Sequence, residues 1–327
     1  MRVGMNFIVN YAKLRWLRYV VKKDNPERKL IVINLLEHLG DIVACEPIVR
    51  HLRQANPDAY LVWAVKKAYR ELIVSNPHID RALVMHCLSE RISLVKRRLF
   101  DEVIDLHFHE RYCSLCRKPL RKMKNGVTIG LGNYFNFGGI LAALAQSVGL
   151  QPLDEPPRVY IPIAARQRVN CLSLPRGFIV ISCSSNNAEK NWPAAKWLEL
   201  VERMTDSYNL AVVEVGIVPL LGDNHSPRYI NLCGKLSILE SAEVIRRASL
   251  FVGIDSGPAH LANAVGTYGI ILMGSYLGFE RYMPFSGPYR TGEMAEIINH
   301  KGPVADISVK KVVEAVSDYF THQAPSR

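Results

Sequence analysis

The sequence lacks the short motifs that mark several large enzyme classes, and their absence narrows its chemistry. It contains no G-x-x-x-x-G-K-S/T loop for nucleoside triphosphates and no G-x-G-x-x-G dinucleotide fingerprint. Gly130 and Gly132 come nearest to that fingerprint, but no convincing strand precedes them. H-E-x-x-H and G-x-S-x-G are missing as well. ATP hydrolysis, hydride transfer, zinc proteolysis and serine hydrolysis are therefore disfavoured.

Long apolar runs are also missing. No stretch reaches the ~18 apolar residues that a membrane-spanning helix needs. The first residues do not form a clean apolar segment followed by a small-residue cleavage site, as a secretory signal would. We therefore expect a cytoplasmic protein, with peripheral attachment to the inner face of the inner membrane left open.

The cysteines do not form a disulfide framework, because the seven of them are odd in number and scattered along the chain. Cys113 and Cys116 make a lone C-x-x-C, whereas a structural zinc site needs four ligands. His107 and His109 lie just upstream and keep a metal site open as an alternative. Ordinary loop cysteines are the favoured interpretation, so the sequence predicts no metal site and no cofactor.

Acidic residues are in short supply. The chain has 41 lysines and arginines against 30 aspartates and glutamates, which gives a net charge of +11. Such a balance favours polyanionic partners, namely nucleic acid, anionic lipid or phosphorylated glycans. No known nucleic-acid recognition module is present, so we expect no nucleic-acid partner.

Residues 1–29 differ from the rest of the chain. Apolar side chains recur at helical spacing among basic ones, and Asn25-Pro26 ends the pattern. A basic amphipathic helix of this kind can lie on an anionic membrane surface. The alternative is a helix that packs on the protein body and exposes a basic side to solvent. The sequence leaves both open.

From residue 30 onward, short strand patterns alternate with helix patterns, which indicates parallel sheets with crossover helices. Residues 30–35 and 178–182 are apolar and rich in β-branched residues, as buried strands are. A helix is expected over residues 42–54. A length of 327 residues suggests two domains, and the proline-rich residues 151–162 are the best linker. We predict an extension over 1–29, a first domain over 30–155 and a second over 156–327.

A phosphate-binding site is predicted where the strand at 250–254 ends in Asp255-Ser256-Gly257. A helix begins there, and its free amides together with the Ser256 hydroxyl can hold a phosphate. His260 lies one turn further along and can add a hydrogen bond. Asp255 suits a hydroxyl group better than a phosphate. The alternative is that Asp255 or Ser256 merely caps the helix.

A second polar loop follows the strand at 178–182. It carries Ser185, Asn186 and Lys190 ahead of Trp192-Pro193. Small hydroxyl and amide groups with a mobile lysine charge suit a diphosphate. The alternative is a solvated lysine beside a tryptophan that anchors the loop in the core.

Gly40-Asp41 follows the first strand and supplies a candidate general base. A carboxylate at a strand end can deprotonate an acceptor hydroxyl, and the glycine lets the substrate approach the backbone. Glu37 and His38 share the loop and are rivals for that role. Capping of the following helix by Asp41 is the alternative.

Three of these segments together resemble a known family, the lipopolysaccharide heptosyltransferases of glycosyltransferase family 9. The resemblance covers residues 30–320 in order and spacing. It lies in Gly40-Asp41 with the Asn56-Pro57-Asp58 turn, in Lys190-Asn191-Trp192-Pro193, and in Asp255-Ser256-Gly257-Pro258-Ala259-His260-Leu261-Ala262. It implies an α/β protein of GT-B architecture, in which two Rossmann-like doubly wound domains face a central cleft.

The resemblance also implies the reaction, which is an inverting, metal-independent transfer of a heptose from ADP-heptose to the lipopolysaccharide core. Asp41 would be the base, Ser185, Asn186 and Lys190 would contact the donor phosphates, and Ser256, Gly257 and His260 would hold the diphosphate with Asp255 near the sugar. Gly40, Glu37, Glu214 and Arg281 are further candidates in the cleft. Residues 213–218 do not match the family's glycine-rich strand end, and the basic extension is not part of its usual pattern. A GT-B enzyme using a UDP-sugar and a non-catalytic module that binds anionic lipid therefore stand as alternatives.

Overall fold

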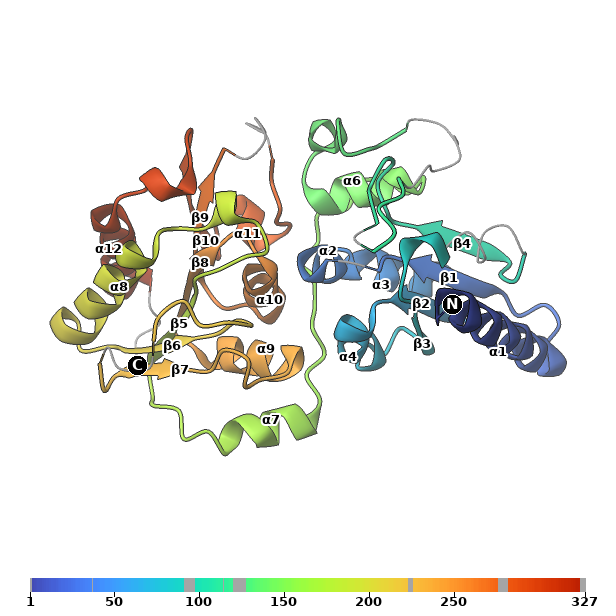
Figure 1. Ribbon diagram of the computed structural model, residues 1–327, viewed down its shortest axis with the longest axis horizontal. Coiled ribbons are helices and arrows are strands. Elements are labelled where there is room, and N and C mark those ends of the chain that lie inside the picture. The colour runs from blue at the N-terminus through green and yellow to red at the C-terminus, as the bar shows by residue number, and fades with distance from the viewer. Residues whose placement is uncertain are drawn as a thin grey trace. The chain divides into compact units, whose positions relative to one another are not determined.

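The computed structural model describes residues 2–36, 38–90, 98–113, 115–119, 128–222, 226–275 and 282–323 (Figure 1). The chain forms two compact units, each with its own parallel sheet. The first unit comprises residues 1–38 and 45–153, and the second comprises 39–44 and 154–327. These two units are discontinuous in the chain, because the segment 39–44 groups with the second unit. The continuous domain limits given from the sequence therefore remain predictions.

The first unit holds a four-stranded sheet in the order β3-β2-β1-β4, with all neighbouring strands parallel. Its strands are β1 (Leu30–Asn34), β2 (Tyr60–Val65), β3 (Arg81–Val84) and β4 (Glu102–Asp105). Its described α-helices are α1 (Arg2–Asp24), α3 (Glu46–Ala55), α4 (Arg70–Val74) and α6 (Ile140–Ser147).

One face of α1 packs on the first unit. Leu14, Leu17 and Val21 are buried in a cluster with residues of β1 and β2. Arg18 and Lys22 fix the helix further, because both form ion pairs with Asp101 at 2.9 Å. The opposite face exposes large apolar side chains, namely Ile8, Trp16, Tyr19 and Val20. One face of α1 therefore packs on the protein body, as one of the two alternatives from the sequence had it. The other face, with aromatic and basic side chains, is exposed to solvent.

The second unit holds six parallel strands in the order β10-β9-β8-β5-β6-β7. Counted from its own first strand this order is 6-5-4-1-2-3, the order of the dinucleotide-binding doubly wound fold. The strands are β5 (Phe178–Ser182), β6 (Ala211–Glu214), β7 (Tyr229–Asn231), β8 (Leu250–Ile254), β9 (Gly269–Gly274) and β10 (Ala295–His300).

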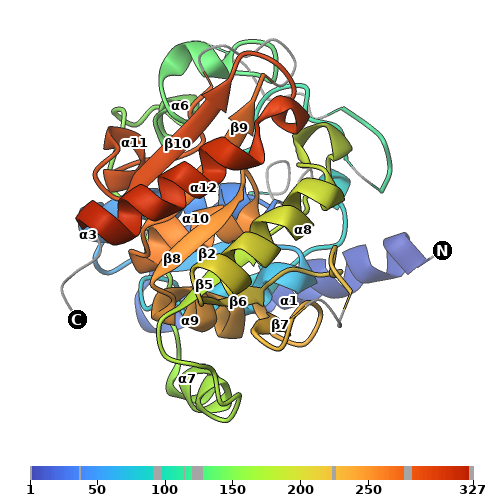
Figure 2. The same ribbon diagram turned by 90° about the vertical axis from the view of Figure 1, so that its left-hand side faces the viewer.

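Helices cover both faces of this sheet, with α8 and α12 on one side and α9 and α10 on the other (Figure 2). The core beneath α8 and α12 includes Trp192 and Trp197, whose rings meet edge to face at 5.0 Å. The described α-helices are α2 (Leu39–Ala44), α7 (Ile163–Asn170), α8 (Ala194–Glu202), α9 (Ile238–Arg247), α10 (Gly257–Val265), α11 (Pro288–Thr291) and α12 (Val309–Asp318).

The helix expected over 42–54 is wrong in its extent, because two helices occupy this region. α2 already begins at Leu39, and α3 begins at Glu46 after a break at Cys45. Pro47 explains the break, since proline has no amide hydrogen for an intrahelical bond but fits the first turn of a new helix.

Across the described residues, no helix is both long enough and apolar enough to cross a bilayer.

Candidate functional site

The predicted phosphate-binding segments follow two neighbouring strands of the second unit. β5 and β8 pair in parallel, with Ser182 opposite Gly253, and the strand order reverses at this pair. In doubly wound sheets, ligands bind beyond the carboxyl ends of the strands at such a reversal. Lys190 lies in the loop after β5, and Asp255 and Ser256 follow β8. The topology thus brings Lys190 and Asp255 together, although they are 65 residues apart in the chain.

The start of α10 presents polar atoms that have no partner among the described residues. Ser256 occupies the N-cap position with an extended backbone, but its hydroxyl makes no capping hydrogen bond. The Ser256 hydroxyl and His260 Nδ1 are both buried and without a hydrogen-bond partner in the described structure. Buried polar atoms normally find partners, so two orphans at one helix start indicate a ligand. The positive end of the helix favours an anion there.

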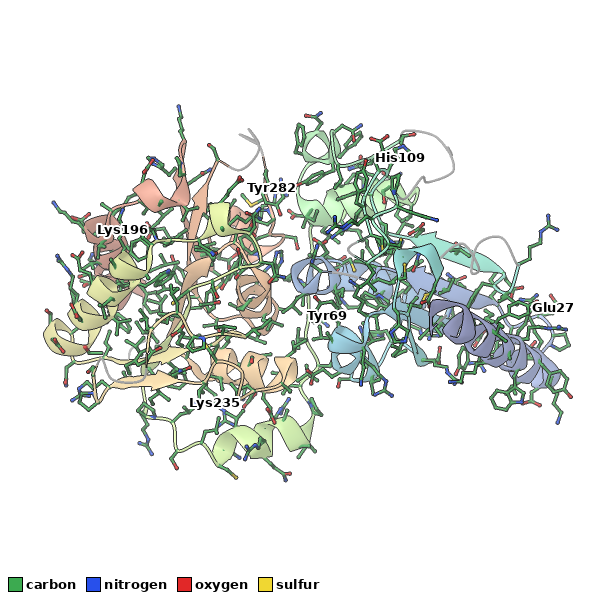
Figure 3. All side chains as sticks on the ribbon, in the orientation of Figure 1. Glu27, Tyr69, His109, Lys196, Lys235 and Tyr282 are labelled. Atoms are coloured by element: carbon green, nitrogen blue, oxygen red, sulfur yellow. The ribbon has the colours of Figure 1, made fainter. Side chains whose placement is uncertain are left out.

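Lys190 and Asp255 join the two loops by an ion pair. Lys190 Nζ lies 2.6 Å from Asp255 Oδ2, and both side chains are largely buried. The ammonium group also lies 5.5 Å from the centre of the Tyr282 ring, which is labelled in Figure 3. This ion pair differs from both alternatives left open by the sequence, namely Asp255 as a plain helix cap and Lys190 as a solvated side chain. It holds the lysine charge at the carboxyl edge of the sheet, beside the predicted phosphate site.

His260 is neutral in this environment. Burial lowers its pKa below the ordinary 6.5 and Lys190 adds to the effect, whereas Asp255 and Asp41 oppose it. Its Nε2 lies 4.0 Å from Asp255 Oδ1. A neutral imidazole has one N–H donor, which is suited to a phosphate oxygen.

Asp41 lies near this cluster, since its charge acts on the pKa of His260. It is the third residue of α2, within the first turn rather than at the N-cap position. Close packing of α2 on α10 sets its place. A Cβ on Gly40 would lie 2.7 Å from His260 Cδ2, and one on Gly257 would lie 2.6 Å from Leu39 Cδ2. The glycines therefore permit the approach of the two helices. His38 is exposed, and Glu37 lies outside the described residues.

Ser185 shapes the loop that carries Lys190. Its hydroxyl donates to the Asn187 carbonyl at 2.8 Å and to Asn191 Oδ1 at 3.1 Å, and its amide donates to the same Asn191 oxygen. Asn186 is exposed on this loop. The role of Ser185 and Asn186 as phosphate contacts stays a prediction, and the network shows that Ser185 also orders the loop.

Glu214 is buried at the end of β6. Its carboxylate accepts hydrogen bonds from the Leu220 amide at 2.9 Å and from the Tyr229 hydroxyl. Burial raises the pKa of Cys183 well above its ordinary value and that of Cys233 to about 12. The negative charge of Glu214 is the second cause of both shifts. These thiols therefore stay protonated. Arg281, the remaining candidate, lies outside the described residues.

The sequence interpretation missed a buried polar group in the first unit, at the ends of β1 and β4. His107 Nδ1 lies 2.9 Å from Asp105 Oδ1, and Asn34 Nδ2 donates to the same oxygen at 3.3 Å. His107 Nε2 accepts the Leu36 amide at 3.1 Å, which places the ring hydrogen on Nδ1. The Asp-x-His spacing after a strand was the available signal. This group fixes the backbone of the first unit at the end of β1, up to the Leu36 amide.

Comparisons with known proteins agree with this geometry. The family model described as glycosyltransferase family 9 (heptosyltransferase) matches residues 140–276, which include Lys190 and the segment 255–260. Lipopolysaccharide heptosyltransferase 3 of Escherichia coli is 21% identical in a match that covers 72% of this chain and 81% of that protein.

Two solved structures share the fold. A glycosyl transferase family 9 protein from Veillonella parvula DSM 2008 has a TM-score of 0.68 at 19% identity, covering 90% of this chain and 98% of that one. The ADP-heptose lipopolysaccharide heptosyltransferase II of Escherichia coli has a TM-score of 0.62 at 17% identity, covering 91% and 100%. The expected GT-B class, with two Rossmann-like α/β units, is confirmed.

Proposed function

This chain belongs to glycosyltransferase family 9, and we propose that it transfers a heptose from ADP-heptose to a lipopolysaccharide core or related envelope glycan, with inversion at the anomeric carbon. That it is a glycosyltransferase follows from the family. The donor, the acceptor and the stereochemistry are the proposal. One observation supports it above all, which is the unpartnered Ser256 hydroxyl and His260 Nδ1 at the start of α10, with Asp41 nearby.

The proposed reaction is a single displacement. An acceptor hydroxyl oxygen attacks the anomeric carbon of the heptose while the bond from that carbon to the ADP diphosphate oxygen breaks. Asp41 accepts the hydroxyl proton as general base. ADP leaves with the bonding electron pair, so negative charge develops on its diphosphate. Attack on the face opposite the leaving group inverts the configuration.

The second unit supplies groups that stabilise the departing diphosphate. The Ser256 hydroxyl, the Gly257 amide and the neutral His260 ring would donate hydrogen bonds, and α10 adds the positive end of its dipole. Lys190 would turn from Asp255 to the phosphates, which leaves the Asp255 carboxylate for a sugar hydroxyl. Fixed donors of this kind are worth most where water is excluded.

We further propose that no metal ion takes part in the transfer, because Lys190 and the positive end of α10 would supply the charge that stabilises the departing diphosphate. Retention of full turnover in EDTA is the expected result. Restoration of lost turnover by added Mg²⁺ would contradict it.

Asp41→Asn tests the proposed base. We expect turnover of ADP-heptose with a lipopolysaccharide-core acceptor to fall by about 10²–10⁴-fold, because the amide cannot accept the proton. The affinity for ADP should change little. Asp318→Asn, on the exposed side of α12, is the matched control. Full turnover in Asp41→Asn would remove Asp41 from the mechanism.

Calorimetric titration separates the alternatives for the donor. We expect ADP to bind the wild-type chain and to bind Ser256→Ala and Lys190→Met more weakly, because each variant removes a phosphate contact. Binding of UDP without binding of ADP would favour the UDP-sugar enzyme. Binding of neither nucleotide, together with binding to anionic vesicles, would favour the non-catalytic lipid-binding module.

The acceptor is an anionic glycolipid in this proposal, so we also propose that the chain docks on an anionic membrane surface through the outer face of α1. That face exposes Trp16 and Tyr19, with 61% and 63% of their surface accessible, among basic residues. Exposed aromatics beside lysine and arginine suit the interface of an anionic bilayer. This would place the enzyme peripherally on the cytoplasmic face of the inner membrane.

A further inference from the structure

We propose that Cys87, Cys113 and Cys116 form a binding site for one zinc ion in the first unit. Cys87 follows β3, while the other two lie in a turn after β4. Their three sulfur atoms all lie within 4.8 Å of one another, and the Cys87 and Cys113 sulfurs are 3.4 Å apart. The sequence showed only the C-x-x-C pair, because the third cysteine is 26 residues upstream of Cys113.

The sulfur separations fit one tetrahedral ion. Zinc–sulfur bonds of about 2.3 Å place the sulfurs of a tetrahedral site roughly 3.8 Å apart. The Cys87–Cys113 separation of 3.4 Å is somewhat shorter than this value and all three separations lie within 4.8 Å, so small side-chain rotations would close the three sulfurs around a single ion. Zinc is the borderline-soft ion that thiolate sites of this geometry take.

The backbone of the turn supports sulfur ligands. The Cys116 amide points at the Cys113 sulfur at 3.5 Å, which stabilises negative charge on a ligating sulfur. The Arg117 amide donates to the Cys113 carbonyl at 2.9 Å, and the Cys113 amide donates to the Lys118 carbonyl at 3.1 Å. Arg117 takes a positive φ of 52° to complete this tight turn. The two sulfurs therefore face the same side of a closed loop.

The fourth ligand position is left to solvent. Among the described residues, no histidine or carboxylate joins the three sulfurs within the same distance. The segments 91–97 and 120–127, which follow Cys87 and Cys116 in the sequence, contain no cysteine, histidine, aspartate or glutamate. Cys116 is only half-buried, so water can reach an ion held there. Three thiolates and Zn²⁺ carry a net charge of −1, which Arg111, Arg117 and Lys118 of the same loop can balance.

Packing alone gives a poorer account of the cluster. Buried cysteines often serve as small apolar side chains, but Cys116 is part-exposed and its neighbours in the turn are basic. A zinc ion would tie the turn to the end of β3 and fix the exposed side chains of Tyr112 and Leu115. This inference is independent of the transfer reaction, because it concerns residues that the reaction does not use.

Metal analysis of the purified full chain tests the site. After expression with zinc and purification under reducing conditions, we expect about one zinc ion per chain by mass spectrometry of the elements. Cys113→Ser and Cys116→Ser should each lower the zinc content at least ~10-fold, because loss of even an outer-shell partner of a ligand costs roughly that much in metal affinity. Cys171→Ser, an exposed cysteine of the second unit, is the matched control and should retain zinc.

A titration of the wild-type chain keeps the test decisive if a variant fails to fold. Zinc is stripped with a chelator and returned against a chromophoric zinc indicator, while the reactivity of the thiols is followed. Uptake of one ion with protection of three thiols supports the site. No uptake, equal uptake by Cys113→Ser, a Cys87–Cys113 disulfide that persists under reducing conditions, or purification with iron or copper in place of zinc would each overturn it.

Discussion

His260 shows how a single residue of the site takes its character from its surroundings. Its ring is buried beside Lys190, Asp255 and Asp41, and burial dominates by lowering its pKa. The same residue type on the surface would be partly protonated near neutral pH. The neutral ring keeps one N–H donor for a phosphate and adds no second cation beside Lys190. Because the native and unfolded chains differ in the pKa of His260, its protonation affects the pH dependence of stability, which can be measured.

We expect the free energy of unfolding to fall as the pH drops below about 6.5. The unfolded chain takes up a proton at its ordinary pKa of 6.5, whereas native His260 takes it up only at lower pH. Well above that pH the ring is neutral in both states, so it does not change the free energy of unfolding with pH. Urea unfolding across this range should show a smaller loss of stability in His260→Asn. The exposed His51→Asn serves as control, and an unchanged slope in His260→Asn would show that the ring is not the cause.

Two helices of the second unit meet through their glycines, and this contact sets the geometry of the site at the level of elements. Gly40 of α2 lies against His260, and Gly257 of α10 lies against Leu39. A methyl group at either glycine would meet an atom of the opposite helix at 2.7 Å or less. The arrangement of the base and the phosphate site therefore depends on two small residues.

Gly40→Ala should displace the His260 ring, because the new methyl group would lie 2.7 Å from Cδ2 and 3.0 Å from Nε2. We expect at least a ~10-fold loss of kcat/KM, as misplacement of site groups by about an ångström produces. Gly132→Ala is the matched control, since nothing lies within 4 Å of a Cβ there. Equal activity of the two variants would show that this contact does not position the site.

The N-terminal helix has two faces with different expected roles. Leu17 lies in the core of the first unit with 4% of its surface accessible, whereas the adjacent Trp16 is exposed. We expect Leu17→Ala to lower the free energy of unfolding by about 2–5 kcal/mol, as cavities in cores do. Trp16→Ala should change it by less than about 0.5 kcal/mol, as surface substitutions do. Chemical denaturation measures both, and equal losses would contradict the assignment of the faces.

The whole molecule carries a net charge of +11, which bears on its encounter with an anionic surface. We expect binding to vesicles of anionic phospholipid, and a decrease of this binding as salt screens the charges. Trp16→Ser with Tyr19→Ser should weaken the binding. Ile163→Ser, at an exposed apolar residue of the second unit, is the control. Equal binding of all variants would show that α1 is not the docking face.

Much of the local structure was predictable from the sequence. The apolar runs at 30–35 and 178–182 contain strands β1 and β5, because a buried parallel strand needs a short continuous run of apolar residues. The extent of α2 and α3 was not predictable in the same way. The helical spacing continues through Cys45, and only the backbone shows where Pro47 separates the two helices.

The sequence by itself determined which segments become strands and helices, and placed the chemistry in the loops after them, because these properties depend on neighbouring residues. It also contains the three segments that resemble glycosyltransferase family 9. Only the tertiary structure decided the long-range partners. Lys190 pairs with Asp255, which is 65 residues away in the chain. Gly40 packs on His260, although strands β2 to β8 lie between them in the chain. Cys87 lies beside Cys113. Residue spacing cannot determine such pairs, because they depend on the order in which strands assemble into a sheet, which no local periodicity records.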